Sequence, residues 1–286
     1  MPELPDLVHV EDVLRGALVG KTIVAARTGD PTVLRLMIRE AFPGALAGRR
    51  LAAIDRRGHF MRFAIEGGLV IVVNAMLAGR YKLVAPESGK KDPRALGLAL
   101  TFGDAPEVQY VDDKRMGKVY LARVEDESQI PIYGQLGLDL TSPAFTRAAF
   151  DRAIAKRRDQ VRAFLMDKKA LASIGNAYAD EILFAAKIHP KTFCNKLDAE
   201  AKGALYESIG RVLAEATAEI RRRNEPPEIK VRDFLKVRGR DGKPCLVCGT
   251  TIRAVRVGDG DACFCPGCQP ETRKLFVTWS KLDASR

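Results

Sequence analysis

The stretch Met1-Pro2-Glu3-Leu4-Pro5-Asp6, taken together with two later segments, decides the fold. Initiator methionine is normally removed before a residue as small as proline, so we expect a mature chain that begins with the secondary amine of Pro2. An α-amine has a pKa near 8, so part of it is unprotonated at neutral pH and can attack an aldehyde-like carbon to form an iminium ion. Glu3 is placed to move a proton beside it. The alternative is an exposed terminus with two turn-forming prolines.

The residues after this stretch predict a helix followed by a β-rich domain. Apolar residues of 5–18 recur at helical spacing, which indicates one buried face. Short β-rich runs follow at 22–26, 51–55, 60–65, 69–73, 81–84, 96–102, 108–111 and 119–124. This texture predicts a β-sandwich or barrel with a helix against it, over residues 1–134. The stretch from Tyr133 to Pro143 is expected to be the hinge out of this domain.

Beyond the hinge the apolar period becomes helical. The clearest helix spans 199–223, and Arg221-Arg222-Arg223 at its end is interpreted as a solvated helix terminus in which cations complement the helix dipole. Glu225-Pro226-Pro227 then interrupts the chain. We therefore expect a helical domain over 143–228 and a small third module over 236–274.

The composition indicates a globular protein with a polyanionic partner. The 286 residues are 47% hydrophobic and 29% charged, with a formal net charge of +11. Such a charge favours nucleic acid first and an anionic membrane surface second. No run of about 18 apolar residues and no signal-peptide core is present, so we expect a cytoplasmic, nucleoid-associated monomer that does not bind membranes.

Clustered cysteines indicate a metal site. Cys245-Leu246-Val247-Cys248 and Cys265-Pro266-Gly267-Cys268 are two C-x-x-C pairs separated by 16 residues, the spacing of a four-thiolate zinc site on a β-hairpin. Four protein ligands leave no open position, so one structural zinc ion is expected. Cys263 could replace Cys265 in a looser register, but the paired spacing favours Cys265. Cys194 stands apart as a small buried or surface thiol.

The zinc module could also be a nucleic-acid-binding ribbon. Five basic residues lie in or just before it and are candidates for phosphate contacts: Arg238, Arg240, Lys243, Arg253 and Arg256. A zinc-ribbon transcription factor is therefore one hypothesis for the whole chain, although such a protein would have no use for the amino-terminal motif.

Three separated segments together resemble the formamidopyrimidine-DNA glycosylase and endonuclease VIII family. They are the amino-terminal Met1-Pro2-Glu3-Leu4-Pro5, residues 171–186 with Gly175-Asn176, and residues 236–248 with the closing Cys265-Pro266-Gly267-Cys268-Gln269. The resemblance implies an α+β chain: an N-terminal β-sandwich with a flanking helix, a helix-two-turn-helix domain, and a C-terminal zinc-finger hairpin. It also implies that DNA binds in the cleft between them.

The implied chemistry suits the residues. A damaged base is flipped out of the duplex, the nitrogen of Pro2 attacks C1′ of its sugar, and elimination then cleaves the strand, with Glu3 as general acid/base. Asn176 matches the family's phosphate contact at the start of a helix, where backbone N–H groups also bind anions. Without the resemblance, Gly175-Asn176 is a helix cap, and both interpretations can hold.

Two residues depart from the family pattern at phosphate-binding positions. Arg56-Arg57-Gly58-His59 has His59 where the family usually has lysine, and histidine is a weaker, pH-dependent phosphate partner or a structural residue. Gly260 stands where the family has a finger-tip arginine, and the adjacent Asp259 and Asp261 would repel phosphates.

Two further segments match those that fill the space left by the flipped base. Leu77 lies at the inserted position of residues 74–79, and residues 112–117 place Met116 at a wedge position and Lys114 at a base-probing position, next to Arg115. Apolar side chains of this size can intercalate, although core positions are the alternative for Leu77 and Met116. We expect all four residues to bind DNA.

The chain from Arg232 to Gly242 leaves no room for the long loop that covers an oxidised purine in formamidopyrimidine glycosylases. The leading hypothesis is therefore a DNA glycosylase with abasic-site lyase activity, closer to endonuclease VIII than to an 8-oxoguanine enzyme, acting on double-stranded DNA with a damaged base or abasic site. The alternative hypothesis is a catalytically weak or inactive member that binds damaged or abasic DNA.

Overall fold

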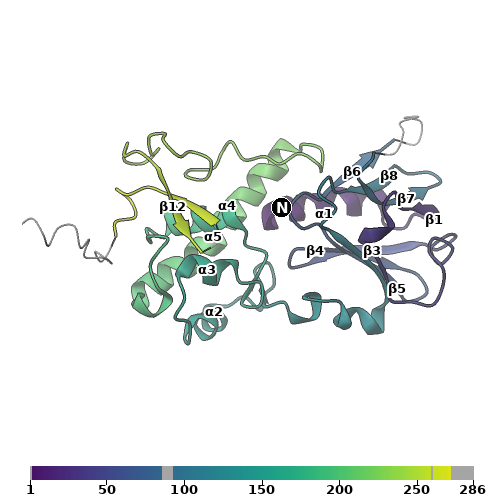
Figure 1. Ribbon diagram of the computed structural model, residues 1–286, viewed down its shortest axis with the longest axis horizontal. Helices are drawn as coiled ribbons and strands as arrows, with labels where there is room; N and C mark the ends of the chain where they lie inside the picture. The colour runs from purple at the N-terminus through teal and green to yellow at the C-terminus, as the bar shows by residue number, and fades with distance from the viewer. Residues whose placement is uncertain (1, 86–92, 259, 272–286) are drawn as a thin grey trace, which may run out of the picture.

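The computed structural model describes residues 2–85, 93–258 and 260–271. Figure 1 shows two lobes side by side, with the strands of the N-terminal half in one lobe and the later helices and the finger in the other. The chain is α+β, with the three parts in the expected order. Among the described residues, no helix combines the length and the apolar character needed to cross a bilayer.

The N-terminal lobe is a β-sandwich with one long helix against it. Helix α1 spans Leu4–Leu18. One sheet has the order β1 (Ile23–Arg27), β7 (Leu96–Phe102), β8 (Glu107–Val111), β6 (Arg80–Val84). The other has the order β2 (Leu34–Leu36), β9 (Lys118–Arg123), β5 (Leu69–Asn74), β4 (Phe60–Ile65), β3 (Leu51–Arg57). The predicted sandwich is confirmed, and its eight predicted strands all occur; β2 was missed.

The missed strand has a local reason. Leu34–Leu36 is only three residues long, pairs in parallel with β9 at the sheet edge, and follows the short 3-10 helix η1 (Pro31–Val33). Gly29-Asp30-Pro31 marks a turn before it, but three residues are too few for an alternating pattern to indicate a strand. Every other strand pair in the two sheets is antiparallel. The apolar residues of the inner faces share one core with the apolar face of α1.

The second lobe is helical. Its helices are α2 (Arg147–Ile154), α3 (Val161–Met166), α4 (Asn176–Ala185) and α5 (Ala199–Arg223), and the linker and loops hold η2 (Val124–Gln129), η3 (Tyr133–Gln135), η4 (Cys194–Lys196) and the parallel pair β10 (Leu138–Asp139) and β11 (Leu171–Ala172). Asp198 caps the start of α5, and Asn224 ends it in the left-handed conformation. The arginines at that end are not simply solvated, because they form ion pairs with Asp12, Glu219 and Asp233.

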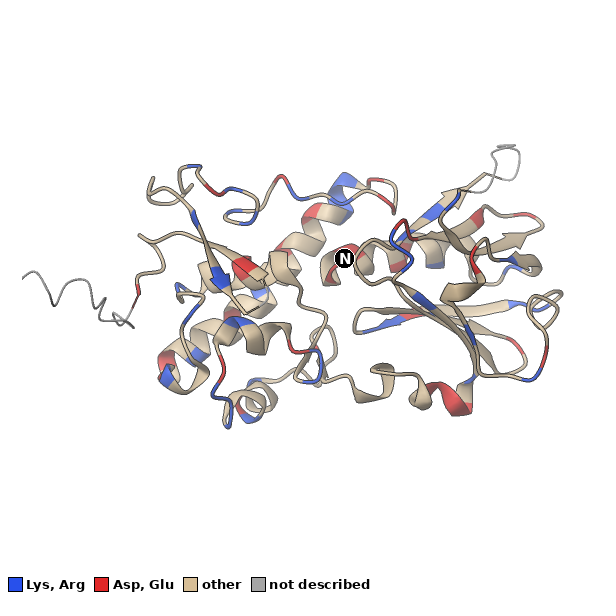
Figure 2. Ribbon diagram, viewed as in Figure 1, with Lys and Arg blue, Asp and Glu red and all other residues tan. Residues whose placement is uncertain are grey.

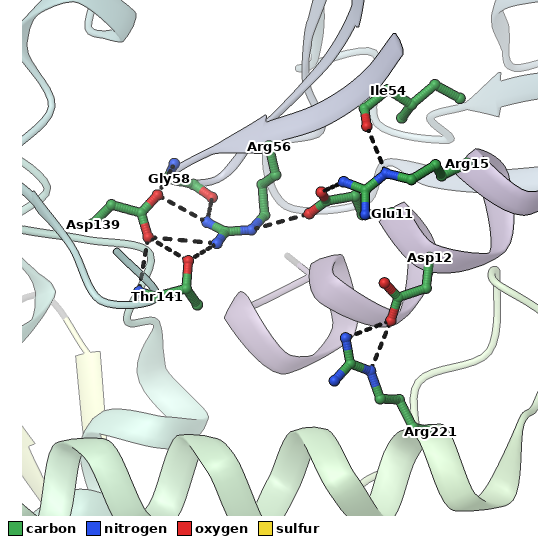
Figure 3. A network of polar contacts seen from close by, with 9 residues as sticks. All are labelled: Glu11, Asp12, Arg15, Ile54, Arg56, Gly58, Asp139, Thr141 and Arg221. Atoms are coloured by element: carbon green, nitrogen blue, oxygen red, sulfur yellow. Dashed lines mark hydrogen bonds and ion pairs between the residues drawn. The ribbon is translucent and has the colours of Figure 1, made fainter. Parts of the chain in front are cut away.

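Helix α1 belongs to the cores of both lobes. Leu4 is buried in the helical core, whereas Leu7, one turn later, is buried in the sandwich core. A polar network strengthens this junction (Figure 3). The Arg56 guanidinium, 4% exposed, donates to Asp139 at 3.3 and 3.4 Å and to Thr141 Oγ1 at 2.5 Å, and its Nε lies 3.8 Å from Glu11. The amino terminus is thereby fixed between the lobes.

The finger consists of β12 (Arg253–Val257) and β13 (Gly260–Phe264), which pair in antiparallel register. Its base packs on the helical lobe through Phe184 and Val237, which share a core with the finger cysteines. The domain limits 1–134, 143–228 and 236–274 stay a prediction, and residues 272–274 lie outside the described part of the chain. Lysine and arginine are spread over both lobes with acidic residues between them (Figure 2).

Candidate active site

The carboxylate of Glu3 lies at the start of helix α4. It accepts hydrogen bonds from the backbone N–H groups of Gly175 at 3.1 Å, Ala177 at 3.0 Å and Tyr178 at 3.1 Å. These donors belong to the amino end of a helix, where free N–H groups and the helix dipole both favour an anion. Two of the segments that carry the family resemblance, Pro2-Glu3 and Gly175-Asn176, therefore meet in the folded chain.

Gly175 is required by this close approach. A Cβ at position 175 would lie 2.5 Å from Cδ and 2.7 Å from Oε1 of Glu3, too near for any side chain. The backbone of Gly175 is extended, so the need is for space and not for an unusual dihedral angle.

Glu3 retains its proton more readily than an exposed glutamate does. Burial raises its pKa, whereas the hydrogen bonds from Ala177 and Tyr178 and the charge of Arg232 lower it without cancelling the effect of burial. A carboxyl group whose pKa lies above its ordinary value is suited to exchange protons near neutral pH. Pro2 is buried beside it, and the expected removal of Met1 concerns a residue outside the described part of the chain.

Arg232 and Asp6 fix the segment that runs from α5 to the finger. Arg232 Nη1 donates to Asp6 Oδ1 at 2.7 Å, and its guanidinium lies 5.2 Å from the ring centre of Tyr178. His9 Nε2 contacts the backbone oxygen of Glu225 at 2.8 Å at the near end of the segment. The segment is thus tied to α1 along its length.

Two loops at the ends of strands present the predicted wedge residues. Leu77 is 50% exposed and Met116 is 40% exposed, so neither is a core residue. Asp112 holds the second loop by accepting hydrogen bonds from the N–H groups of Lys114 at 3.1 Å and Gly117 at 2.6 Å. The Lys114 side chain is exposed.

Arg115, exposed like Lys114, forms an ion pair. Its Nε lies 3.3 Å from Asp30 Oδ2, and its backbone has a positive φ of 53°. A positive φ in a non-glycine residue costs free energy, and such residues cluster at functional sites. DNA binding by Arg115 would therefore exchange its bond to Asp30 for one to phosphate.

Asn176 lies beside the tip of the finger hairpin. Its Oδ1 accepts a hydrogen bond from Arg162 Nη2 at 2.7 Å, and a Cβ on Gly260 would lie 3.5 Å from the same oxygen. The position expected to carry the finger arginine therefore does lie next to Asn176. Asp259 is outside the described residues, and the backbone oxygen of Asp261 accepts from Arg162 at 3.1 Å.

A buried ion-pair network docks the finger and was not predicted. Asp180 accepts from Arg162 Nε at 2.8 Å, Arg238 Nη1 at 2.9 Å and the backbone N–H of Cys263 at 2.9 Å. Arg238, expected to contact phosphates, thus bonds to protein through Nη1. Next to it, Glu181 accepts from three successive backbone N–H groups of residues 236–238. The sequence signal for this network was the pair of adjacent acidic residues, Asp180 and Glu181, on an otherwise apolar helix.

The four predicted zinc ligands converge. The sulfur atoms of Cys245, Cys248, Cys265 and Cys268 lie within 4.8 Å of one another, with pairs at 3.4, 3.5 and 3.9 Å. Tetrahedral ligation with Zn–S of about 2.3 Å requires about 3.8 Å between sulfurs, so the set fits one structural zinc ion. Cys263 is not among the cysteines whose sulfur atoms converge, and its backbone N–H donates to Asp180; the paired register is correct.

Comparisons with known proteins agree along the whole chain. Three family profiles match in order: the formamidopyrimidine-DNA glycosylase N-terminal domain at residues 1–119, the formamidopyrimidine-DNA glycosylase H2TH domain at 136–223, and the zinc finger found in FPG and IleRS at 242–270. The formamidopyrimidine-DNA glycosylase of Symbiobacterium thermophilum is 33% identical over 94% of this chain and 90% of that protein. This chain belongs to the formamidopyrimidine-DNA glycosylase family.

Solved structures of the family have the same architecture. The MutM (Fpg) protein of Thermus thermophilus matches with a TM-score of 0.82 and 30% identity, over 95% of this chain and 100% of that one. The Fpg of Lactococcus lactis in complex with abasic-site DNA matches with a TM-score of 0.82 and 25% identity, over 94% and 100%. As a member of this family, the chain is a DNA glycosylase and abasic-site lyase with one structural zinc site.

Within this glycosylase, His59 is not the exposed cation that the family lysine would be. It is 4% exposed, and burial, with a smaller effect of the Lys168 charge, lowers its pKa to about 3. The imidazole is therefore neutral at pH 7. Its role in DNA binding stays a prediction, and any such contact would be made by an uncharged ring.

Proposed function

We propose that Pro2 and Glu3 carry the glycosylase and lyase reactions of this enzyme. The Pro2 nitrogen attacks C1′ of the damaged nucleotide, the bond from C1′ to the base breaks, and the base leaves with a proton. The C1′–O4′ bond of the sugar ring then breaks as the nitrogen, having lost its proton, forms the C1′=N⁺ iminium, and O4′ takes up a proton. The iminium makes the C2′ proton acidic; its removal forms the C2′–C3′ double bond and breaks the C3′–O3′ bond, with the 3′ phosphate as the leaving group. The observation that carries this proposal is the buried Glu3 carboxylate, held by three N–H groups beside Pro2.

We propose that the partner is duplex DNA containing a damaged base or an abasic site. The exposed Leu77 and Met116 would occupy the space of the flipped nucleotide, with Lys114 and Arg115 beside them. Asn176 would hold a backbone phosphate through its side-chain amide nitrogen, since Glu3 already occupies the N–H groups of Gly175, Ala177 and Tyr178 at the start of α4. The complex of the Lactococcus lactis relative with abasic-site DNA supports this choice of partner.

We further propose a base preference nearer to endonuclease VIII, with oxidised pyrimidines favoured over 8-oxoguanine. The support is the short tied segment after α5: Arg232 is bound to Asp6, and the N–H of Lys236 is bound to Glu181 at 2.9 Å. Only three residues separate these two anchors, too few for a loop that covers a purine.

A second candidate function is a family member that binds damage with little or no catalysis. Gly260 has no side chain to replace the finger-tip arginine of the family, and the neutral His59 cannot replace the positive charge of the usual lysine. Both losses affect phosphate binding, whereas Glu3 and its N–H donors are intact. We therefore place the active enzyme first.

Borohydride trapping tests both functions. The protein, with its amino terminus checked by mass, is incubated with duplexes that carry an abasic site, a dihydropyrimidine or 8-oxoguanine. The matched control is the same chain extended by a short peptide, which converts the Pro2 nitrogen into an amide. We expect an adduct on the abasic and dihydropyrimidine duplexes that the extended chain does not form. Tight binding without an adduct would contradict the lyase function and support the second candidate, a family member that binds damaged DNA with little or no catalysis.

A further inference from the structure

The turn between β3 and β4 meets the helical lobe just after α3. A Cβ on Gly58 would lie 2.9 Å from Cδ1 of Leu136 and 3.1 Å from Cβ of Ala172. The N–H of Gly137, next to Leu136, donates to the backbone oxygen of Lys168 at 2.9 Å. His59 follows Gly58 directly, so the contacts bring His59 and Lys168 to one place from different lobes.

Glu3 lies at the same place. Its carboxylate is bound to Gly175, three residues after Ala172. The charge of Glu3 acts on Lys168, whose pKa burial lowers and Glu3 raises, and the charge of Lys168 acts in turn on His59. The backbone contacts of Gly58, Gly137 and Gly175, together with these charge effects, place the three residues in one region beside the proposed nucleophile.

Lys168 is the cation of this cluster. Most of its side chain is buried, yet no hydrogen bond or ion pair joins its ammonium group to any of the residues that the structure describes. Buried charges in proteins are normally paired, because the loss of hydration costs several kcal/mol. The Lys168 side chain is of intermediate exposure, and its ammonium group, without an ion-pair partner among the described residues, is available to an anion that comes from a ligand.

Two further polar groups in this region are also unsatisfied. His59 Nδ1 and Ser173 Oγ are buried, and neither has a hydrogen-bond partner among the described residues. Ser173 also has a φ of 100°, which strains any residue other than glycine. Strain and unsatisfied polar atoms beside a catalytic carboxylate are typical of a ligand-binding position.

We propose that Lys168 binds a DNA backbone phosphate next to the target sugar and supplies the positive charge that His59 does not. This proposal rests on the proposed function, because it takes DNA as the ligand. Lys168 lies in a turn after α3, whereas His59 lies in the turn between β3 and β4 of the other lobe. The positive charge that the family lysine would supply at position 59 is thus supplied by Lys168 from the other lobe, and the same backbone phosphate is its proposed ligand.

The test compares Lys168→Met with Lys169→Met, which removes the exposed neighbouring lysine. Dissociation constants are measured over a range of KCl concentrations on a duplex with a tetrahydrofuran abasic-site analogue. For Lys168→Met we expect about tenfold weaker binding and a slope of log K against log salt that is smaller by about one. The slope of Lys169→Met should equal that of the wild type.

Two further measurements exclude a purely structural role. Lys168→Met should be at least as stable to urea as the wild type, because it removes a partly buried charge that has no ion-pair partner among the residues that the structure describes. His59→Lys combined with Lys168→Met should regain the lost salt slope. An unchanged slope in Lys168→Met, or a lost slope that the double variant does not regain, overturns the proposal.

Trapping separates this proposal from the function on which it rests. Lys168→Met should still form the borohydride adduct through Pro2. An adduct that requires Lys168 and survives blocking of the Pro2 amine would make Lys168 the nucleophile and overturn the phosphate role. No adduct in any variant would overturn the lyase function, whereas the salt slope would still decide whether Lys168 binds phosphate.

Discussion

The backbone N–H of Gly175 donates to the carboxylate of Glu3 at 3.1 Å, although 172 positions of sequence separate the two residues. This bond joins the first residues of the sandwich lobe to the start of helix α4 in the other lobe. It makes the geometry of the active site depend on how the two lobes are packed together.

Gly175→Ala should therefore disable the enzyme. The new Cβ would displace the Glu3 side chain, since it would lie 2.5 Å from Cδ, and we expect base excision to fall by about 100-fold, the scale on which general acid/base groups contribute. The measurement is single-turnover excision, with urea unfolding alongside. Gly210→Ala is the matched control: this helical glycine has no atom within 4 Å of an added Cβ, so activity should stay and stability should rise by about 1 kcal/mol. Full activity in Gly175→Ala would contradict the proposed role of Glu3.

The buried guanidinium of Arg56 should hold the lobes together. Arg56→Met would leave Asp139 without its main cation, and we expect unfolding to become easier by about 3 kcal/mol. Burial raises the pKa of Asp139, but Arg56 and the hydrogen bonds from Thr141 and Gly58 bring it below its ordinary value. The charge of Asp139 is therefore part of the folded state.

A double-mutant cycle checks this account. Asp139→Asn combined with Arg56→Met should recover part of the loss, because no unpaired charge remains. Arg50→Met, at an exposed arginine, should change the free energy of unfolding by less than about 0.5 kcal/mol. Equal losses in the single and double variants would mean that packing, and not the ion pair, stabilises the junction.

The zinc register can be tested one cysteine at a time. Cys265→Ser should abolish the single bound zinc ion, because it removes one of four converging thiolates. Cys263→Ser should retain the metal, since Cys263 is outside the cluster. Zinc per chain is measured by elemental analysis of dialysed protein, with Cys194→Ser as the remote control. Retention of zinc in Cys265→Ser would show that Cys263 can take its place.

Features with local patterns could be predicted from the sequence. The apolar face of α1 and the runs of the sandwich follow from side-chain periodicity, and the zinc ligands follow from the spacing of Cys245, Cys248, Cys265 and Cys268. The later segments that belong with Pro2 and Glu3 could be identified only through the family resemblance. Contacts between distant segments could not be predicted, because they depend on side-chain directions that only the packed lobes determine. Asp180 with Arg162, and Glu3 with Gly175, are the clearest cases.

The low pKa of His59 makes a prediction about acid stability. In the unfolded chain a histidine has a pKa near 6.5, whereas burial, and to a lesser extent the charge of Lys168, lower the pKa of folded His59 to about 3. Below pH 6.5 the unfolded state therefore binds a proton that the folded state does not. The stability contributed by the neutral ring is complete above pH 6.5 and is lost as the pH falls toward 3.

His59→Gln should remove this acid sensitivity. Between pH 7 and pH 5 the wild type should lose about 2 kcal/mol more of its free energy of unfolding than the variant does, from about 1.36 kcal/mol per pKa unit over about 1.5 units. Urea unfolding at several pH values gives the difference, and every other titrating group is common to both proteins. Parallel curves for the two proteins would mean that folded His59 takes up its proton near pH 6.5. Position 59 would then carry a positive charge that depends on pH and can contact phosphate, and the proposal that Lys168 replaces this charge would lose its support.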